Sequence, residues 1–245
     1  MRSLLCLPLL LLFINCGNSS KKSEEHHTGL SEAAAAEVLV KDSIQPVSEP
    51  ETQTSVPDLT ALNDTVFVRL ADYSDDFRYD LRYATTNNFL KSQVYECPEC
   101  YVRATTAKAL IAVNEKFMEQ GYRIKFFDCY RPHDVQKKMW KIMPNPIYVA
   151  DPAEGSIHNK GGAVDITLET LEGEELPMGT TFDFFGREAH HAYTKLPEDV
   201  LKNRKLLKET MEEFGFGSIT SEWWHYNYKP VLDLSVANFT WDCPE

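Results

Sequence analysis

The stretch S-I-H-N-K-G-G-A-V-D-I-T, residues 156–167, joins a histidine, a glycine pair and a carboxylate within an alternating apolar run. The alternation over residues 162–168 predicts a β-strand with one apolar face. The glycine pair before it allows the chain to double back, so that His158 and Asp165 can face one point. The stretch therefore predicts a strand whose polar face carries a candidate metal ligand.

The elements on either side of this strand mix helices and strands without a regular βαβ order. Such a mixture predicts an α+β fold rather than a doubly wound sheet. We expect a single domain with a central antiparallel sheet flanked by helices. The expected helices cover 105–120, 134–142 and 198–214, and the further strands cover 123–130 and 223–228.

Composition limits the classes of partner. The chain has 245 residues and a formal net charge of −12, and an acidic chain is repelled by nucleic acids and by anionic lipid headgroups. No window holds the roughly 18 consecutive apolar residues that a transmembrane helix requires. We therefore expect no nucleic-acid partner and no membrane span.

The N-terminal segment predicts export. Residues 1–16 combine a basic start with a short apolar run, as in a bacterial signal peptide, and Cys16 stands where a lipoprotein carries its acylated cysteine. Ordinary signal-peptide cleavage is the alternative. Residues 17–60 are expected to form a flexible acidic tether, and 61–245 the folded domain. The predicted location is the periplasm or a membrane face, with the lipid anchor as the only membrane contact.

A second stretch, S-E-W-W-H-Y at 221–226, supplies a third candidate ligand. His158, Asp165 and His225 would form a His₂Asp zinc site with an open fourth position, as catalytic zinc sites have. Glu222 could then act as a general base toward zinc-bound water. Each element alone is weak, because a histidine beside tryptophans is usually a packed core residue.

Strand alternation also predicts the roles of the two tryptophans. Trp223 would share the face of His225 and line the metal pocket, and Trp224 would pack into the core on the other face.

An arginine at the end of an apolar strand is the candidate for stabilising negative charge. The sequence F-F-D-C-Y-R-P, residues 126–132, places Arg131 between that strand and a new helix. Hydrolysis of an amide develops an oxyanion, which a fixed guanidinium would stabilise. The alternative is a surface arginine paired with Asp134.

The combined motifs S-x-H-x-x-G-x-A-V-D, E-W-W-H-Y and D-x-Y-R-P resemble those of the zinc D-alanyl-D-alanine dipeptidases. This family includes the vancomycin-resistance dipeptidases and belongs to a metallopeptidase group that shares its fold with the Hedgehog signalling domain. The likeness continues through residues 82–89, 101–103 and 177–185. It implies that His158, Asp165 and His225 bind zinc, that Glu222 is the base, and that Arg131 stabilises the intermediate.

The resemblance also implies a substrate, the free dipeptide D-Ala-D-Ala. Ser156 would hold its carboxylate, Asp183 its ammonium, and Tyr83 would line the pocket. Cys129 departs from the family pattern, in which a small Gly or Ala is frequent at that position. An exported enzyme of this kind would serve peptidoglycan turnover or salvage. The sequence gives no oligomeric state.

The motifs leave two alternative functions. A D,D-carboxypeptidase or peptidoglycan endopeptidase of the same fold is disfavoured by Asp183, since an ammonium-binding carboxylate suits a free N-terminus. A non-catalytic zinc-binding or cell-wall-binding lipoprotein is disfavoured by Glu222, because a pure binding site needs no base. His190 and His191 are expected to be structural or to support the metal ligands indirectly, because no partnered carboxylate lies at a useful spacing.

Four cysteines remain in the folded part, and they allow three pairings. In an oxidising compartment disulfides are favoured over a second metal site. We expect either Cys97 or Cys100 to pair with Cys129, and the other to hold the C-terminal tail at Cys243.

Overall fold

The computed structural model describes residues 56–243. The predicted signal peptide, Cys16 and most of the tether lie outside these residues. The first described element is a 3₁₀ helix, Leu59–Ala61, which Asp58 caps through the Thr60 N–H. Within the described part of the chain, no helix is both long and apolar enough to cross a membrane.

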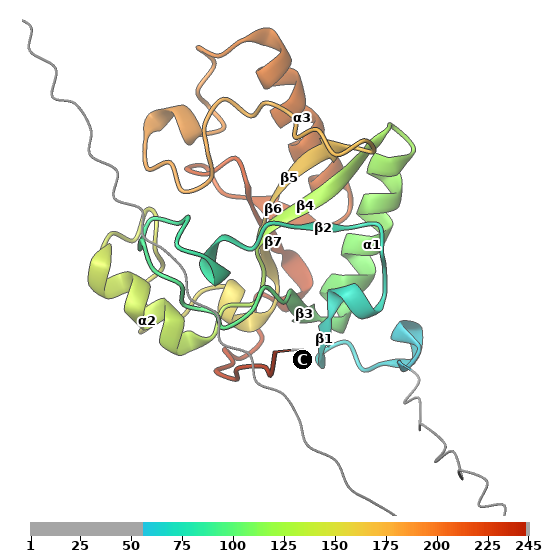
Figure 1. Cartoon of the computed structure of the whole chain (residues 1–245), viewed down its shortest axis with the longest axis vertical. Helices are drawn as coiled ribbons and strands as arrows, with labels where there is room; N and C mark the ends of the chain where they lie inside the picture. Colours follow the sequence, from blue (N-terminus) through green and yellow to red (C-terminus); the bar gives the residue numbers. More distant parts are fainter. Residues whose placement is uncertain (1–55, 244–245) are drawn as a thin grey trace, which may run out of the picture. The chain divides into compact units, whose positions relative to one another are not determined.

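A five-stranded sheet with the order β2-β4-β5-β7-β6 forms the centre of the domain (Figure 1). Its β4–β5, β5–β7 and β7–β6 pairs are antiparallel, whereas the edge strand β2 is parallel to β4. The predicted α+β class is confirmed. The predicted antiparallel sheet has this one parallel pair as an exception. A parallel pair needs a crossover connection, and the segment with β3 and α1 provides it. The strands are β1 Phe67–Arg69, β2 Arg78–Tyr79, β3 Tyr101–Arg103, β4 Tyr122–Asp128, β5 Ala163–Thr170, β6 Phe216–Ser218 and β7 His225–Tyr228.

Two of the helices pack together, and the third lies apart from them (Figure 1). Helix α1, Ala104–Met118, contacts β4 and α3, and α3, Glu198–Glu213, contacts β6. Helix α2, His133–Ile142, begins directly after Pro132, where the ring fixes a backbone suited to a helix start. All three helices begin within one residue of the predicted positions.

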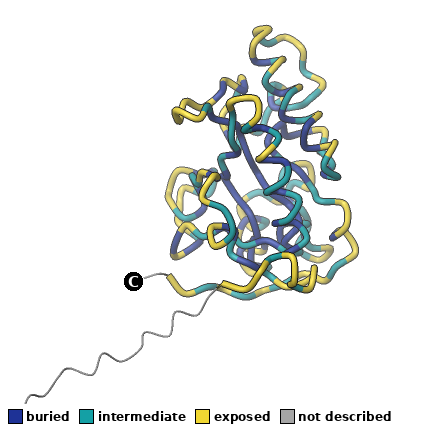
Figure 2. Tube along the Cα trace, turned by 90° about the vertical axis from the view of Figure 1, so that its right-hand side faces the viewer, coloured by how far each residue is buried: buried dark blue, intermediate teal, exposed yellow. Residues whose placement is uncertain are grey.

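Strand β5 is buried on both of its faces. Val164, Ile166 and Leu168 belong to the hydrophobic core, as the alternation predicts. Asp165 and Thr167 on the opposite face are also buried, at 3% and 0% exposure. Figure 2 shows the same enclosure of the central strands by the surrounding chain. The polar face of β5 is therefore an interior surface, in which an unpaired charge would be costly.

Two disulfides connect the start of β3 with distant segments. Cys100 pairs with Cys129, and Cys97 pairs with Cys243. The expected pattern is confirmed, and the structure decides which of the two N-terminal cysteines takes which partner.

Gly161, at the end of the 3₁₀ helix His158–Lys160, provides a stability test. Its φ is +73°, and a Cβ there would lie 2.3 Å from the Phe67 ring. We expect Gly161→Ala to lower the free energy of unfolding by about 1–3 kcal/mol more than Gly173→Ala. Gly173 has a φ of +95° but no atom within 4 Å of the added methyl group, so it isolates the backbone cost. Chemical denaturation of both variants measures the difference, and equal losses would show that the contact with Phe67 is not tight.

Candidate active site

A row of polar residues crosses three neighbouring strands at one level. Asp128 on β4 pairs with Asp165 on β5, and Asp165 pairs with His225 on β7. Directly opposed residues project to the same face of a sheet. The register of β4 shifts between Phe126 and Asp128, and this irregularity brings Asp128 opposite Asp165 at the strand end.

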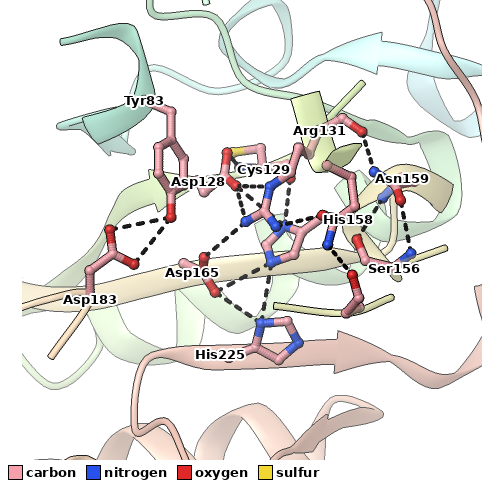
Figure 3. Close-up of polar contacts among 12 residues, drawn as sticks. Tyr83, Asp128, Cys129, Arg131, Ser156, His158, Asn159, Asp165, Asp183 and His225 are labelled. Atoms are coloured by element: carbon pink, nitrogen blue, oxygen red, sulfur yellow. Dashed lines mark hydrogen bonds and ion pairs between the residues drawn. The ribbon is translucent and has the colours of Figure 1, made fainter. Parts of the chain in front are cut away.

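The three predicted ligand residues meet at one point (Figure 3). His158 Nε2 lies 3.2 Å from His225 Nδ1 and 3.4 Å from Asp165 Oδ1, and His225 Nδ1 lies 3.0 Å from Asp165 Oδ1. Four ligands placed tetrahedrally around zinc at about 2.0–2.1 Å would be about 3.3 Å apart. The three atoms therefore have the mutual spacing of a tetrahedral site with one position open.

Each histidine ring has one nitrogen hydrogen-bonded outside the cluster, and this bond fixes which nitrogen faces the cluster. His158 Nδ1 lies 2.7 Å from the Cys129 carbonyl oxygen, so it carries the proton and donates it. His225 Nε2 lies 2.9 Å from Asn227 Oδ1 and donates in the same way. Each ring then presents an unprotonated nitrogen to the cluster, beside the Asp165 carboxylate. Two lone pairs and a carboxylate together form a donor set that fits a divalent cation.

The charges in the cluster favour a cation as well. Burial acts to raise the pKa of Asp165, but His158 and His225 hold it well below its usual range. Burial acts to lower the pKa of His225, but the hydrogen bond and negative charge of Asp165 raise it overall. The interior face of the sheet therefore holds a firmly ionised carboxylate that stabilises positive charge next to it.

Arg131 is held on this face by two buried partners (Figure 3). Its Nε and Nη2 donate to Asp128 Oδ2 at 3.1 and 2.7 Å, and its Nη1 donates to Gln136 Oε1 at 2.8 Å. Burial would lower the pKa of Arg131, but the Asp128 carboxylate raises it well above its usual value, so the guanidinium stays charged. The alternative pairing with Asp134 is wrong, because Asp134 bonds Lys137 and Asn238 instead.

A cavity of about 230 Å³ opens beside the cluster. It is smaller than the roughly 300–1,000 Å³ of pockets for drug-sized ligands, which indicates a small ligand. All eight predicted site residues line it: Tyr83, Arg131, Ser156, His158, Asp165, Asp183, Glu222 and His225.

Glu222 is a buried carboxyl group at the cavity, and its pKa is raised. It is 7% exposed and lines the cavity together with His225. Burial raises its pKa to about 8, although the electrostatic interaction with the neighbouring His225 ring acts to lower it. A carboxyl with a pKa near neutrality can both accept and return a proton at physiological pH.

Asp183 lies against Tyr83 at another part of the cavity wall. The Tyr83 hydroxyl is 3.1 and 3.2 Å from the two carboxylate oxygens of Asp183, and the Phe89 N–H donates to Oδ2 at 3.4 Å. Asp183 has a φ of +59°, which is uncommon for a residue other than glycine. Burial, and then the charge of Asp165, raise its pKa to about 7. This carboxyl group lacks a cationic partner among residues 56–243, and it would gain from one.

Ser156 is fixed by Asn159. The Ser156 N–H donates to Asn159 Oδ1 at 2.8 Å, and the Asn159 N–H donates to Ser156 Oγ at 3.3 Å. Asn159 Nδ2 in turn donates to the Arg131 carbonyl at 2.7 Å. The serine loop and the arginine segment are therefore held together by one asparagine side chain.

Both tryptophans are 1% exposed and belong to the hydrophobic core, which confirms the core packing expected of Trp224, but Trp224 and not Trp223 lines the cavity. Trp224 lines the cavity and packs against Phe182 at 5.5 Å between ring centroids. Trp223 is buried away from the cavity, where its indole N–H donates to Thr180 Oγ1 at 2.8 Å. Strand β7 begins only at His225, so strand alternation does not extend back to these residues.

Four residues that hold the site were not predicted: Asp128, Gln136, Asn159 and Asn227. Asp128 had a usable signal, since it stands three residues before Arg131 in the quoted motif. The other three are single amides without a recognisable spacing.

His190 and His191 lie outside the cluster. The Nε2 atoms of both are buried and lack a hydrogen-bond partner within residues 56–243. Burial lowers the pKa of His191 to about 4, so this ring is neutral at physiological pH. Their placement agrees with the expected structural role.

Several known proteins are similar to this chain. The model of the Peptidase_M15 family, described as D-ala-D-ala dipeptidase, matches residues 63–237. The D-alanyl-D-alanine dipeptidase of Escherichia coli (strain K12) is 33% identical over 179 residues, covering 73% of this chain and 93% of that protein. The D-alanyl-D-alanine dipeptidase of Enterococcus faecium is 31% identical, covering 73% and 97%. Among solved structures, a vancomycin resistance D,D-pentapeptidase in complex with Zn(II) has a TM-score of 0.34 and 16% identity, covering 53% and 73%.

Proposed function

Because the chain belongs to the D-Ala-D-Ala dipeptidase family of metallopeptidases, we propose that it is a zinc-dependent hydrolase of the free dipeptide D-Ala-D-Ala. The observation that carries the proposal is the convergence of His158 Nε2, Asp165 Oδ1 and His225 Nδ1 beside a buried glutamate and a buried arginine.

Zinc is the metal that this donor set suits best. Two imidazole nitrogens and one carboxylate oxygen, with a fourth position open, are typical of catalytic zinc, whereas Mg²⁺ and Ca²⁺ prefer oxygen ligands throughout. When bound, Zn²⁺ polarises a carbonyl oxygen and lowers the pKa of a water molecule. His158, Asp165 and His225 would hold it.

The surrounding side chains supply proton transfer and charge stabilisation. Glu222 accepts the proton of the attacking water and returns it to the leaving amine, a role that its raised pKa favours. Arg131 stabilises the negative charge that develops on the carbonyl oxygen. Asp128 and Gln136 fix its guanidinium before the substrate arrives, so little reorganisation is needed during the reaction.

Groups on two sides of the ligand cluster would limit the length of the substrate (Figure 3). Arg131 connects the ligand cluster with the ammonium end: its Nη2 is 3.9 Å from Asp165 Oδ2, and its Cζ is 5.4 Å from the Tyr83 ring. Tyr83 in turn bonds Asp183, which would bind the free ammonium group. Ser156 would bind the terminal carboxylate. A peptide with a blocked or extended N-terminus would leave Asp183 buried without a cation.

A panel of three substrates tests this proposal. Free D-Ala-D-Ala, its N-acetylated form and a cell-wall pentapeptide are offered to the zinc-loaded protein, with and without a chelator. We expect cleavage of the free dipeptide alone, and its loss on chelation. Equal cleavage of the blocked forms would favour a D,D-carboxypeptidase or endopeptidase, and cleavage of none would favour a binding protein.

Asp183→Asn tests whether Asp183 binds the ammonium group of the substrate. Asparagine tolerates the positive φ but cannot form an ion pair with an ammonium group. The value of kcat/KM for the free dipeptide should therefore fall about 10- to 100-fold. The ratio of free to N-acetylated substrate turnover should fall with it. A variant with an unchanged ratio would remove Asp183 from the substrate site.

The same substitution should alter the pH dependence of stability. The pKa of Asp183 in the folded chain, about 7, exceeds the roughly 3.9 of an unfolded aspartate. The folded state therefore holds the extra proton between these values, and its free energy of unfolding falls as pH rises from about 4 to about 7. Metal-free Asp183→Asn lacks this contribution, so it should gain stability relative to the wild type over the same interval. Urea denaturation at pH 5 and pH 8 measures the change.

We further propose that the chain is exported, as a periplasmic protein or a lipoprotein anchored through Cys16, and acts in peptidoglycan turnover or salvage. The two disulfides support an oxidising compartment. Mass spectrometry of the mature N-terminus tests the anchor, since a diacylated Cys16 and a processed unmodified N-terminus differ in mass.

A further inference from the structure

The Cys100–Cys129 disulfide lies next to the candidate metal site, and Cys129 touches that site through its backbone. The Cys129 carbonyl accepts the proton of His158 Nδ1 at 2.7 Å, and the Cys129 N–H donates to Asp128 Oδ1 at 3.0 Å. Two residues later, the Arg131 N–H donates to the His158 carbonyl at 3.2 Å. The segment 129–131 is therefore hydrogen-bonded to both the side chain and the backbone of His158.

This segment has little support from the sheet. Strand β4 ends at Asp128, so the ladder with β5 does not continue through Cys129. The anchors to the neighbouring strand β3 are the disulfide to Cys100 and one hydrogen bond, from the Tyr130 N–H to the Tyr101 carbonyl at 2.9 Å. Both cysteines are 2% exposed. The disulfide is thus an interior cross-link placed at the point where sheet pairing stops.

We propose that the Cys100–Cys129 disulfide is a positioning element for the metal site. It fixes the Cys129 carbonyl, which holds the His158 ring with Nε2 toward Asp165 and His225. It also fixes the backbone from which Asp128 and Arg131 reach the cavity. Hydrogen-bond partners of a metal-bound imidazole change metal affinity by about 10- to 100-fold. This inference rests on the proposed zinc site.

The second disulfide provides a matched control within the same chain. Cys97–Cys243 closes a loop with a sequence separation of 146, against 29 for Cys100–Cys129. Loop-closure entropy therefore predicts that removal of Cys97–Cys243 lowers stability at least as much as removal of Cys100–Cys129. Neither Cys97 nor Cys243 hydrogen-bonds a residue of the site. A positioning role and a stabilising role consequently predict opposite orders of effect for the two pairs.

The test compares wild type, Cys100→Ala/Cys129→Ala and Cys97→Ala/Cys243→Ala, each assayed for zinc affinity by chelator competition, for kcat and for Tm. We expect the Cys100/Cys129 variant to lose zinc affinity about 10- to 100-fold and to lower kcat. The Cys97/Cys243 variant should keep wild-type zinc affinity despite an equal or larger drop in Tm. Wild-type zinc affinity in the Cys100/Cys129 variant, or equal losses in both, would overturn the proposal. If the alanine pair does not fold, Cys100→Val/Cys129→Ala fills more of the buried volume and takes its place.

A second readout does not depend on zinc. In metal-free wild type, the His158 Nδ1 proton should exchange slowly with solvent, because it is buried and donates to the Cys129 carbonyl. Imidazole NMR should show faster exchange or loss of this proton in the Cys100/Cys129 variant, but not in the Cys97/Cys243 variant. If the wild type binds no zinc, the proposed function fails while this measurement still decides on the positioning role.

Discussion

Glu222→Gln should lower kcat for D-Ala-D-Ala by about 10²–10⁴-fold while the protein still binds one zinc ion. Glutamine has nearly the same size as glutamate but cannot accept the proton of the attacking water. Zinc binding should persist, because the converging ligand atoms belong to His158, Asp165 and His225. Metal content and single-turnover rates measure both quantities on the same preparation.

Glu169→Gln is the control for this substitution. Glu169 is a second buried glutamate, 5% exposed, and it pairs with Arg123 at 3.0 Å outside the cavity. Its replacement should reduce stability and leave kcat unchanged. Full turnover in Glu222→Gln, or an equal loss of kcat in both variants, would refute the assignment of Glu222 as the base.

Arg131→Lys should lower kcat by about 10²–10³-fold, the usual effect of removing one stabilising donor from an oxyanion site. Lysine keeps a positive charge but cannot reproduce the fork that bonds Asp128 and Gln136 at the same time. The charge would then be neither fixed nor aimed at the carbonyl oxygen. KM should change less than kcat, since the interaction is strongest in the transition state.

Arg204→Lys is the matched control, because Arg204 is also a buried arginine. Its guanidinium donates to the Met178 and Glu188 carbonyls at 2.7 and 2.9 Å, and it does not line the cavity. Both substitutions should lower Tm, but only Arg131→Lys should lower kcat. A wild-type kcat in Arg131→Lys would mean that the guanidinium is structural.

The positions of the ligands follow from local rules that the sequence already contains. Alternation placed Asp165 on the polar face of β5, and the glycines after His158 allow the return of the chain. The tight turn is visible in the left-handed conformation of Gly161. His225 could be joined to them only through the combined motifs, since strand pairing between residues 60 positions apart is not readable from spacing.

Other features depend on tertiary pairing and could not be predicted. The parallel placement of β2 beside β4 depends on the path of the intervening chain. Trp223 was wrongly placed at the cavity because β7 starts one residue after Trp224, and strand boundaries are poorly defined in sequence. Asn159 and Asn227 act through side-chain hydrogen bonds across loops or along one strand, for which the sequence has no periodic signal.

Zinc titration of chelator-stripped protein is the most direct test of the central claim, that one His₂Asp zinc site hydrolyses the free dipeptide. Release of D-alanine from D-Ala-D-Ala should be absent without metal, rise in proportion to added zinc and stop rising at one zinc per chain. His225→Ala, which removes one ligand, should show no such endpoint. Hydrolysis at an undiminished rate by the stripped wild type, or no hydrolysis with one zinc bound per chain, would contradict the account.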